Sequence, residues 1–523
     1  MDPVLILAVF NRSSSHGKYE DHDLGIYSKM SEQPLKRVAV IGAGISGVVS
    51  AGHLLAAGLD VRVFERSKAA GGVWLYDKRV PIELQYPSVY PTSVEKFYED
   101  KRDENEKQRL KHAPPGPCYE NLTNNVSTPL LRTKLNAWPQ GTLPYVNHHV
   151  LKEYIQDTAK KVGVEEVTTY GALVTNVYKE EQKWNVRWRS LFEDTKTGKL
   201  FEKEESDTFD AIVVASGHYH TPLVPDIPGL AEAKSRWPDK IAHSKSFRNA
   251  EGFEGKWLIS FQNVLLIGGG VSSIDIAREI SPVTRNIFQS TRNGAFDIPA
   301  TALPGKASRV EEVTKFEIFP TTEKDETHLP FVAHLKSGST LQDIDRIVLC
   351  TGYQMALPFF PQYNDKDNSS ETALVTDGSQ VHNLHHDIFY IPDPTLAFVG
   401  IPFYTATFTL FEFQAIAVAA VFSQTVRLPS KEDMRLVYRE KIATKGLGRS
   451  FHSLKGEEEA YVKTLLKWVN FERTTRGLDP IEGHTATWLE EKKAQVERLT
   501  LIFQGAVPYG FTNSSSAEVK TAA

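Results

Sequence analysis

Two glycine-rich turns are the residues of this chain best suited to hold phosphate groups. The first reads Gly42-Ala-Gly-Ile-Ser-Gly47 and the second reads Gly268-Gly-Gly-Val-Ser-Ser273. Glycine permits a tight turn and lets backbone N–H groups approach a pyrophosphate, and a helix that begins there directs its positive N-terminus at the same group. The sequence therefore predicts two dinucleotide-binding sites.

The strand that follows each turn ends in residues that distinguish one nucleotide from another. After the first turn comes Glu65, whose carboxylate can accept hydrogen bonds from ribose hydroxyls and would repel a 2′-phosphate. After the second turn the strand ends in Gln289-Ser-Thr-Arg292, which contains no acid, and Arg292 can pair with a 2′-phosphate. We therefore expect FAD at the first site and NADPH at the second.

Both turns lie inside the same order of elements, which is strand, turn, helix and strand. The expected segments are 37–41, 48–57 and 60–65 in the first unit and 263–267, 274–280 and 286–290 in the second. Two more apolar runs, 210–217 and 345–352, end in a small hydroxyl residue and glycine, which let backbone lie close to a cofactor or a crossing chain.

This repetition predicts an α/β protein with two Rossmann-like dinucleotide-binding domains, the NADPH domain being inserted in the FAD domain. The expected parts are a flexible N-terminal extension (1–35), a first part of the FAD domain (36–245), the NADPH domain (246–334), and a second part of the FAD domain with C-terminal helices (335–523). The segments 431–469 and 485–499 are expected to be amphipathic helices.

Composition excludes several other classes of protein. The 523 residues carry a net charge of −5, which disfavours nucleic-acid binding. Only Cys118 and Cys350 occur, which excludes a disulfide framework, a CxxC redox pair and a cysteine-rich zinc site, and a reducing compartment, the cytoplasm, is expected. The histidine pairs lack a carboxylate pattern for a metal, so no metal is expected.

No membrane span is expected either. The most apolar stretch, 410–422, is too short and contains Glu412 and Gln414, so it is interpreted as a buried helix. Residues 86–147 interrupt the first unit with charged and proline-rich sequence, which fits either a solvated surface loop or a lid over a substrate entrance.

At Ala70-Gly-Gly-Val-Trp-Leu-Tyr76 the sequence resembles the class B flavin-containing monooxygenases, whose GGxWxY segment follows the ribose glutamate. Further elements of that family have counterparts between residues 36 and 425. They are Leu122-Thr-Asn-Asn125 for L-x-x-N, Trp237 to Phe247 for the FxGxxxHxxx(F/Y) fingerprint, the GxGxxS of the second turn, and Cys350-Thr-Gly-Tyr353 for ATGY.

The resemblance implies that NADPH reduces FAD, that O₂ adds at flavin C4a, and that the hydroperoxide delivers one oxygen atom to a nitrogen or sulfur of a small substrate. It assigns Asn125 as the catalytic residue, unless Asn125 only forms a turn. The cofactor-binding residues expected from the turns and the resemblance are Gly42, Ala43, Gly44, Ser46, Gly47, Glu65, Arg66, Gly72, Val73, Trp74, Val174, Thr351, Gly352, Gly268, Gly270, Ser272, Ser273 and Arg292.

Some residues depart from the family pattern and leave the substrate class open. Trp237 and Asp239 replace the Phe and Gly of the fingerprint, and Ser127 stands where a proline usually follows. The fingerprint ends in Phe247 and not in the Trp of typical Baeyer–Villiger members. Baeyer–Villiger oxygenation of a ketone therefore stays an alternative, as does a flavin-binding protein without turnover.

Overall fold

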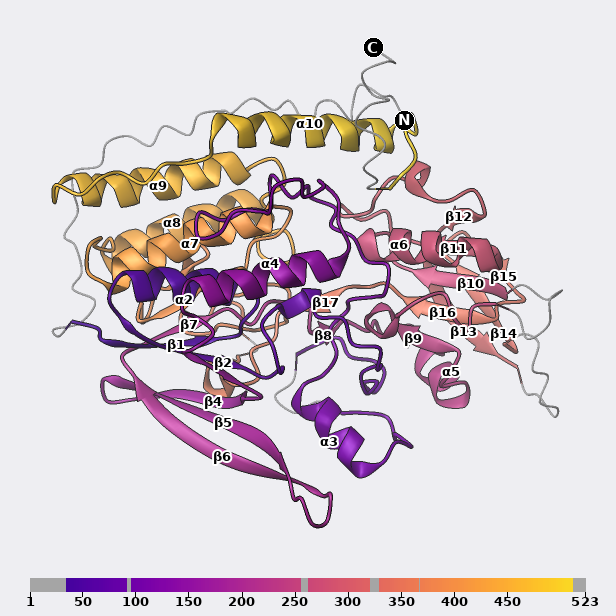
Figure 1. Cartoon of the computed structure of the whole chain (residues 1–523). Helices are drawn as coiled ribbons and strands as arrows, with labels where there is room; N and C mark the ends of the chain where they lie inside the picture. Colours follow the sequence, from indigo (N-terminus) through magenta and orange to yellow (C-terminus); the bar gives the residue numbers. More distant parts are fainter. Residues whose placement is uncertain (1–33, 92–95, 255–261, 320–328, 366, 511–523) are drawn as a thin grey trace.

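Two mainly parallel sheets carry the two glycine turns (Figure 1). The computed structural model describes residues 34–91, 96–254, 262–319, 329–365 and 367–510, so the predicted extension 1–35 lies outside it except for its last two residues. The first sheet has the strand order β18 (Leu384–His385), β19 (Phe389–Tyr390), β20 (Leu396–Phe398), β7 (Ala211–Val214), β1 (Arg37–Ile41), β2 (Asp60–Glu65) and β3 (Thr168–Tyr170).

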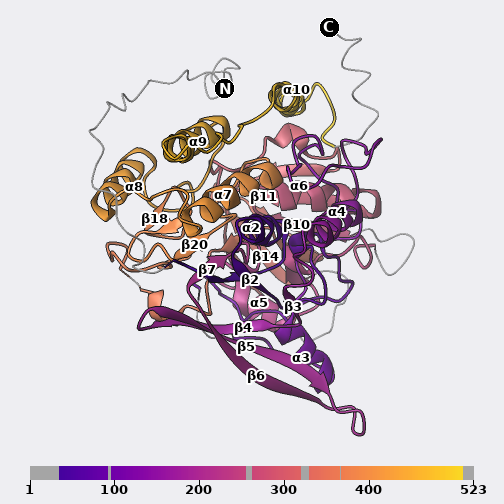
Figure 2. The same ribbon diagram turned by 60° about the vertical axis from the view of Figure 1, so that its left-hand side comes forward.

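The first sheet is buried on both faces because its strands direct alternate apolar side chains into two cores. On β1, Val38 and Val40 face a core that contains helices α2 (Ile45–Ala56), α4 (His148–Lys161) and α7 (Thr407–Phe422). Ala39 and Ile41 face the opposite core. That core is closed by an antiparallel sheet, seen at the bottom of Figure 2, of β4 (Leu173–Glu180), β5 (Lys183–Glu193) and β6 (Leu200–Phe209).

The second sheet is parallel throughout and has five strands. Their order is β12 (Ala307–Val310), β11 (Thr284–Ser290), β10 (Gln262–Ile267), β16 (Arg346–Leu349) and β9 (Ile241–His243). Beside it lie α5 (Leu230–Arg236) and the antiparallel strands β13 (Val313–Ile318), β14 (Phe331–Leu335) and β15 (Thr340–Leu341). Because β9 and β16 pair into this sheet, it extends beyond the boundaries 246 and 334 drawn from the sequence.

The chain passes between the two sheets along two short strands that pair with each other. β8 (Thr221–Pro222) leads out of the first sheet, and β17 (Tyr353–Gln354) leads back from the second. Every strand of the second sheet therefore lies, in sequence, between β8 and β17.

The C-terminal helices lie on the first sheet's helical face, with one exception. The apolar stretch 410–422 is the core of the buried helix α7, as predicted. The predicted helix 431–469 is instead two helices, α8 (Lys431–Lys445) and α9 (Glu458–Thr474), because Gly446 and Gly448 have positive φ angles and end the first. Within the described residues no helix combines the length and apolar character that crossing a bilayer demands.

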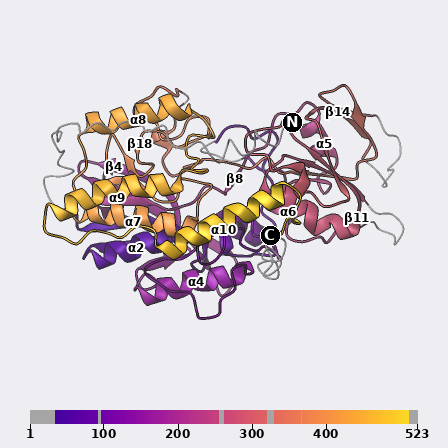
Figure 3. The same ribbon diagram turned by 90° about the horizontal axis from the view of Figure 1, so that it is seen from above.

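The last helix, α10 (Ala486–Phe503), crosses from the part of the molecule built on the first sheet (the first unit) to the part built on the second sheet (the second unit) (Figure 3). Near its beginning, Trp488 donates to the carbonyl of Leu130 at 3.3 Å. At its end, the carbonyl of Phe503 accepts from Thr301 Oγ1 at 2.7 Å, and Ile502 packs with Ile274 of helix α6 (Val271–Ile280). One helix thus contacts both parts of the molecule.

Candidate functional site

The first glycine turn is held against the neighbouring strand by its backbone. Gly42 N–H donates to the carbonyl of Phe64 at 2.8 Å, and Gly42 has φ +104°, a conformation that favours glycine. A β-carbon on Gly42 would lie 2.6 Å from the carbonyl oxygen of Ala215 at the end of β7. A β-carbon on Gly47 would lie only 1.8 Å from the carbonyl oxygen of Gly42, so α2 packs on the turn as the motif predicts.

A second glycine turn, Gly71-Gly72, packs on the first. Gly71 N–H donates to the carbonyl of Ala43 at 3.0 Å, and a β-carbon on Gly72 would lie 2.9 Å from the Cα atom of Gly44. The residues Gly72, Val73 and Trp74 form the short helix η1 (Gly72–Trp74) directly beside the turn. The structure thus brings the GGVW segment and the first turn together.

Glu65 is the last residue of β2, and Arg66 follows it at the edge of the first turn. Glu65 is buried, and its carboxylate accepts backbone N–H groups from Ala43 and from Ser67, each at 2.7 Å. Arg66 lies with its guanidinium nitrogens 2.9 and 3.1 Å from the two ring nitrogens of His220. Val174 is buried on β4, next to the segment whose Ala172 N–H donates to the Glu65 carbonyl at 2.8 Å.

The second turn repeats the first in its backbone. Gly268 has φ +124° and donates to the carbonyl of Ser290 at 2.8 Å. This register places Thr291 where Glu65 stands in the first unit, and Arg292 where Arg66 stands. Arg292 is exposed, and its side chain has no hydrogen-bond or ion-pair partner among the described residues.

Helices α2 and α6 both begin in a way that suits a phosphate. They start after Gly44 and Gly270, and no side chain of the described residues caps either one. Among these residues nothing lies within 4 Å of a β-carbon on Gly270. Ser46 and Ser273 are buried and Ser272 is half-buried in the first turns of the two helices. Uncapped N–H groups beside open space are what a bound pyrophosphate uses.

Thr351 and Gly352 lie at the second turn, whereas the sequence grouped them with the FAD domain. They follow β16, which pairs with β10, and a β-carbon on Gly268 would lie 2.2 Å from the carbonyl oxygen of Cys350. Thr351 Oγ1 donates to the carbonyl of Leu223 at 2.5 Å. In the first turn the end of β7 takes the equivalent place.

Asn125 lies in a loop whose shape is fixed by its neighbour. Asn124 is buried, donates to the carbonyls of Val126 and Pro144 at 2.8 Å each, and accepts from Val146 N–H at 2.6 Å. Asn125 is exposed. The loop adjoins η1 through α4, since His148 N–H donates to the Leu122 carbonyl at 2.8 Å and the His148 ring lies 5.4 Å from that of Tyr76.

Gln495 of α10, which the sequence did not single out, secures this loop. Its Oε1 accepts from Ser127 N–H at 3.1 Å and its Nε2 donates to the Asn125 carbonyl at 3.4 Å. Asn124 therefore makes the side-chain hydrogen bonds that shape the loop, whereas the Asn125 side chain is exposed. No local pattern could have revealed Gln495, which lies 370 residues from Asn125.

The fingerprint segment forms a buried connection between the two units. His243 Nε2 lies 3.1 Å from the carbonyl of Gly352, and its Nδ1 accepts from Lys245 N–H at 3.1 Å. Burial, with a smaller contribution from the charge of Lys245, lowers the pKa of His243 to about 3, so the ring stays neutral. Lys245 Nζ donates to the His220 carbonyl at 2.7 Å. These residues hold the ends of β8 and β16 together.

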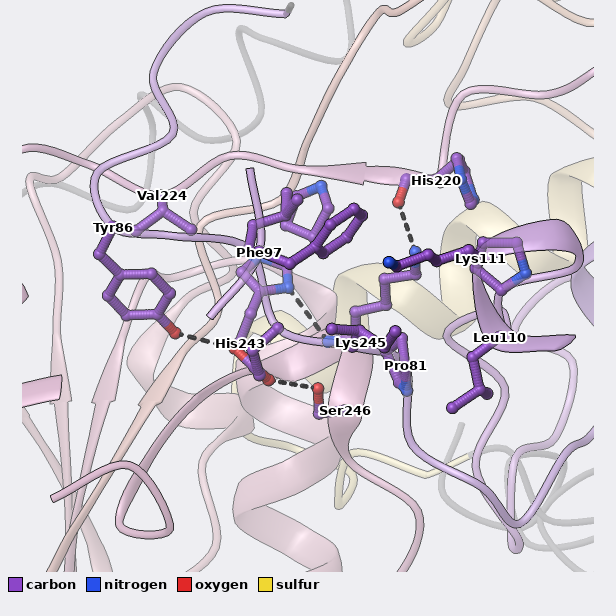
Figure 4. A pocket seen from close by; sticks show the side chains of 15 residues that line it. Pro81, Tyr86, Phe97, Leu110, Lys111, His220, Val224, His243, Lys245 and Ser246 are labelled. Atoms are coloured by element: carbon purple, nitrogen blue, oxygen red, sulfur yellow. Dashed lines mark hydrogen bonds between the residues drawn. The ribbon is translucent and has the colours of Figure 1, made fainter. Parts of the chain in front are cut away.

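A cavity lies between this segment and residues 81–86 (Figure 4). Its polar groups are satisfied by one another, since Ser246 Oγ donates to Glu83 at 2.5 Å and Tyr86 OH donates to the same carboxylate at 3.3 Å. Among the described residues that line it there is neither Asn125 nor any member of the two glycine turns. This cavity therefore belongs to the connection between the units.

Contacts between aromatic rings also connect the first unit with the second unit. Phe296, from the loop after β11, stacks on Tyr404 with ring centroids 5.7 Å apart and contacts Phe403 at 5.8 Å. Tyr219, after β7, contacts Tyr353, after β16, at 5.7 Å. Tyr219 and Tyr404 are 50% and 41% exposed, so part of each side chain faces solvent.

Comparison with known proteins identifies the family. The family model described as "Flavin-binding monooxygenase-like" matches residues 35–95 and 118–320. "Flavin-containing monooxygenase ustF2" from Aspergillus flavus is 46% identical over 491 residues, which cover 89% of this chain and 98% of that protein.

The chain belongs to the flavin-binding monooxygenase-like family.

Other relatives agree with this membership. "Flavin-containing monooxygenase ustF1" from Aspergillus flavus is 44% identical over 461 residues, covering 88% of this chain and 89% of that protein. The solved S-allyl-L-cysteine S-oxygenase from Allium sativum has the same fold, with a TM-score of 0.65 and 24% identity over 93% of this chain and 98% of that one. The chain is thus a flavin-containing monooxygenase that uses a flavin cofactor and acts on a small molecule, and the predicted family, activity and enzyme class are confirmed.

Proposed function

We propose that this monooxygenase binds FAD at the first glycine turn, binds NADPH at the second, and transfers one oxygen atom from O₂ to a nitrogen or sulfur of a small substrate. One observation carries the cofactor assignment. In the same backbone register, the first turn is followed by buried Glu65, and the second by neutral Thr291 and exposed Arg292. A carboxylate favours ribose hydroxyls, and an exposed guanidinium favours a 2′-phosphate.

The chain's own residues bind, orient and exclude water. The bound flavin supplies the redox and oxygen chemistry. The turn residues Gly42, Gly44 and Gly47 with Ala43 and Ser46 would hold the FAD pyrophosphate, while Glu65 would accept from its ribose, near Arg66 and Val174. Gly72, Val73 and Trp74 would line the ribityl and flavin end. Gly268, Gly270, Ser272 and Ser273 would hold the NADPH pyrophosphate, next to Thr351 and Gly352.

Asn125 is proposed as the catalytic residue. Its amide can donate a hydrogen bond to an oxygen held beside η1, and its loop position is set by Asn124 and Gln495. No general acid or nucleophile of the protein is needed, because the reactive oxygen comes from O₂ and the protein's task is to keep water away from it.

The preference for nitrogen or sulfur rests on two supports. A protein of the same fold is a named S-oxygenase, and the fingerprint ends in Phe247, where typical Baeyer–Villiger members have Trp. Oxidation of a panel containing a thioether, a tertiary amine and a cyclic ketone, followed by product mass, tests it. A lactone as the main product would reject the proposal in favour of Baeyer–Villiger oxygenation.

The proposed role of Asn125 is tested by the fate of the oxygen. Asn125→Ala should leave flavin content and NADPH-driven flavin reduction nearly unchanged, while a larger fraction of the NADPH consumed should appear as H₂O₂ instead of product. Asn121→Ala is a suitable control, because Asn121 lies in the same exposed segment and its amide binds Glu279 at 2.9 Å. Unchanged H₂O₂ in Asn125→Ala would show that Asn125 only shapes the loop.

A further inference from the structure

Arg449 reaches the second glycine turn from a distant part of the chain. It lies in the loop between α8 and α9, whose neighbours Phe451 and Leu454 belong to the core of the first sheet. Its Nη2 donates to the carbonyl of Tyr353 at 3.3 Å, and a β-carbon on Gly352 would lie 3.9 Å from that nitrogen. The guanidinium therefore stands just beyond the end of β16.

Arg449 and Arg292 flank the second turn from opposite sides. The strand order β11, β10, β16 places the turn, which follows β10, between the strand that leads to Arg292 and the strand beside Arg449. In a Rossmann unit the pyrophosphate lies over the glycine turn at the helix N-terminus, between the two nucleosides. Arg292 is thus on the side of the 2′-phosphate, and Arg449 is on the side of the glycine turn facing the first unit.

The positive charges of Arg292 and Arg449 act on each other across the second turn. Partial burial lowers the pKa of Arg449, although the residue as a whole is exposed, and the positive charge of Arg292 lowers it further. Within the described part of the chain neither arginine forms an ion pair with an acid. The carboxyl group of Asp297 packs on the turn, since a β-carbon on Gly269 would lie 2.4 Å from its Cγ, but its Oδ2 is held by Thr291 Oγ1 and Gly294 N–H, at 2.5 and 3.0 Å.

Two cations beside one glycine turn, neither of them ion-paired to an acid, favour an anion there. We infer that Arg449 binds the pyrophosphate of the nicotinamide dinucleotide. The first unit would thus supply a cation to a nucleotide that is bound by the second unit. This inference rests on the proposed NADPH site. It divides the work between the two arginines, because the pyrophosphate is common to NADP⁺ and NAD⁺ whereas the 2′-phosphate occurs in NADP⁺ alone.

Dissociation constants of NADP⁺ and NAD⁺, measured by calorimetry on the FAD-loaded protein, test the assignment without turnover. Arg449→Ala should weaken both dinucleotides about tenfold and by the same factor, as expected for the loss of one charge-assisted hydrogen bond. Arg292→Ala should weaken NADP⁺ alone. Arg285→Ala is the matched control, because Arg285 is an exposed arginine at the opposite end of β11 and should change neither constant.

Three results would overturn the inference. Unchanged affinities in Arg449→Ala would remove Arg449 from the site, and weakening of NADP⁺ alone would move it to the 2′-phosphate. If Arg449→Ala fails to retain FAD, Arg449→Lys and Arg449→Gln are compared in its place. Arg449→Lys, which keeps the positive charge, must then lose less affinity for both dinucleotides than Arg449→Gln. An unmodified protein that binds neither dinucleotide would overturn the proposed NADPH site itself, and the inference with it.

Discussion

The first and second nucleotide units have one backbone plan but different side chains at equivalent places. In each unit the first glycine of the turn donates its N–H to a carbonyl near the end of the next strand. Gly42 donates to Phe64 and Gly268 donates to Ser290, each at 2.8 Å. Both also lie against the carbonyl at the end of a neighbouring strand, that of Ala215 or of Cys350. The backbone hydrogen bonds therefore fix which residues of the two units are equivalent.

That register shows that an arginine follows both strand ends. Arg66 is engaged with the ring of His220, and Glu65 precedes it, while Arg292 is exposed and follows Thr291. The presence of an arginine is thus not what distinguishes the two sites. What differs is the residue before it and whether the guanidinium is already occupied by the protein.

The largest expected difference between the units concerns helix packing. Gly47→Ala should destabilise the protein by at least about 3 kcal/mol and yield protein without flavin, because its methyl group would lie 1.8 Å from the Gly42 carbonyl. In the second unit Ser273 already has a β-carbon and donates to the Gly270 carbonyl at 2.8 Å. Ser273→Ala should therefore cost only about 1 kcal/mol. Thermal unfolding measures the stability of each variant, and the flavin-to-protein absorbance ratio measures its flavin content. Equal losses of stability in Gly47→Ala and Ser273→Ala would refute the contrast.

The next contrast concerns the cofactors themselves. Gly44→Val should give colourless protein, because the side chain would fill the space of the FAD pyrophosphate and press on Gly72. Gly270→Val meets only open space among the described residues, so that variant should stay yellow. Flavin reduction by NADPH should be at least about a hundredfold slower in this variant, which corresponds to a free-energy difference of roughly 2.7 kcal/mol. Full flavin content in Gly44→Val would mean that the first site is assigned wrongly.

A smaller effect is expected at the strand ends. Arg292→Ala should reduce the preference for NADPH over NADH by about ten- to a hundredfold, the equivalent of roughly 1.5–3 kcal/mol for a charge-assisted contact, while flavin content stays constant. Arg66→Ala should leave the preference unchanged. The ratio of kcat/KM for the two reductants measures this, and equal use of both by the unmodified protein would contradict it.

The smallest effect concerns the helices, where Val49 of α2 corresponds to Asp275 of α6. Burial raises the pKa of Asp275 to about 6, above its ordinary value of 3.8, against the lowering effects of Arg278 and the hydroxyl of Tyr119. A raised pKa means that folding becomes less favourable as the pH rises from about 4 through 6. Asp275→Asn should therefore stabilise the protein at pH 8 by about 1–2 kcal/mol and have little effect near pH 4, and urea midpoints at both values measure it. A gain that is equal at both values would refute it.

The elements around the turns could be predicted from sequence because their signals are local. Strands 37–41 and 60–65 have the predicted limits, since short apolar runs between turn residues define them. The full extent of the second sheet could not be predicted, because the apolar run 345–352 does not reveal that β16 pairs with β10, nor that β9 pairs with β16. Arg449 and Gln495 carry no local signal, and contacts across more than ninety residues place them at the site.

Helix α10 links the position of the second unit to the loop of the first unit that contains Asn125. Its end is tied to Thr301 of the second unit, and Gln495 on the same rigid rod grips the segment from Asn125 to Ser127. If the second unit rotated about the β8–β17 connection, it would displace Gln495 and the loop to which Gln495 is hydrogen-bonded. Helix α10 would then couple a movement of the second unit to the loop that contains Asn125.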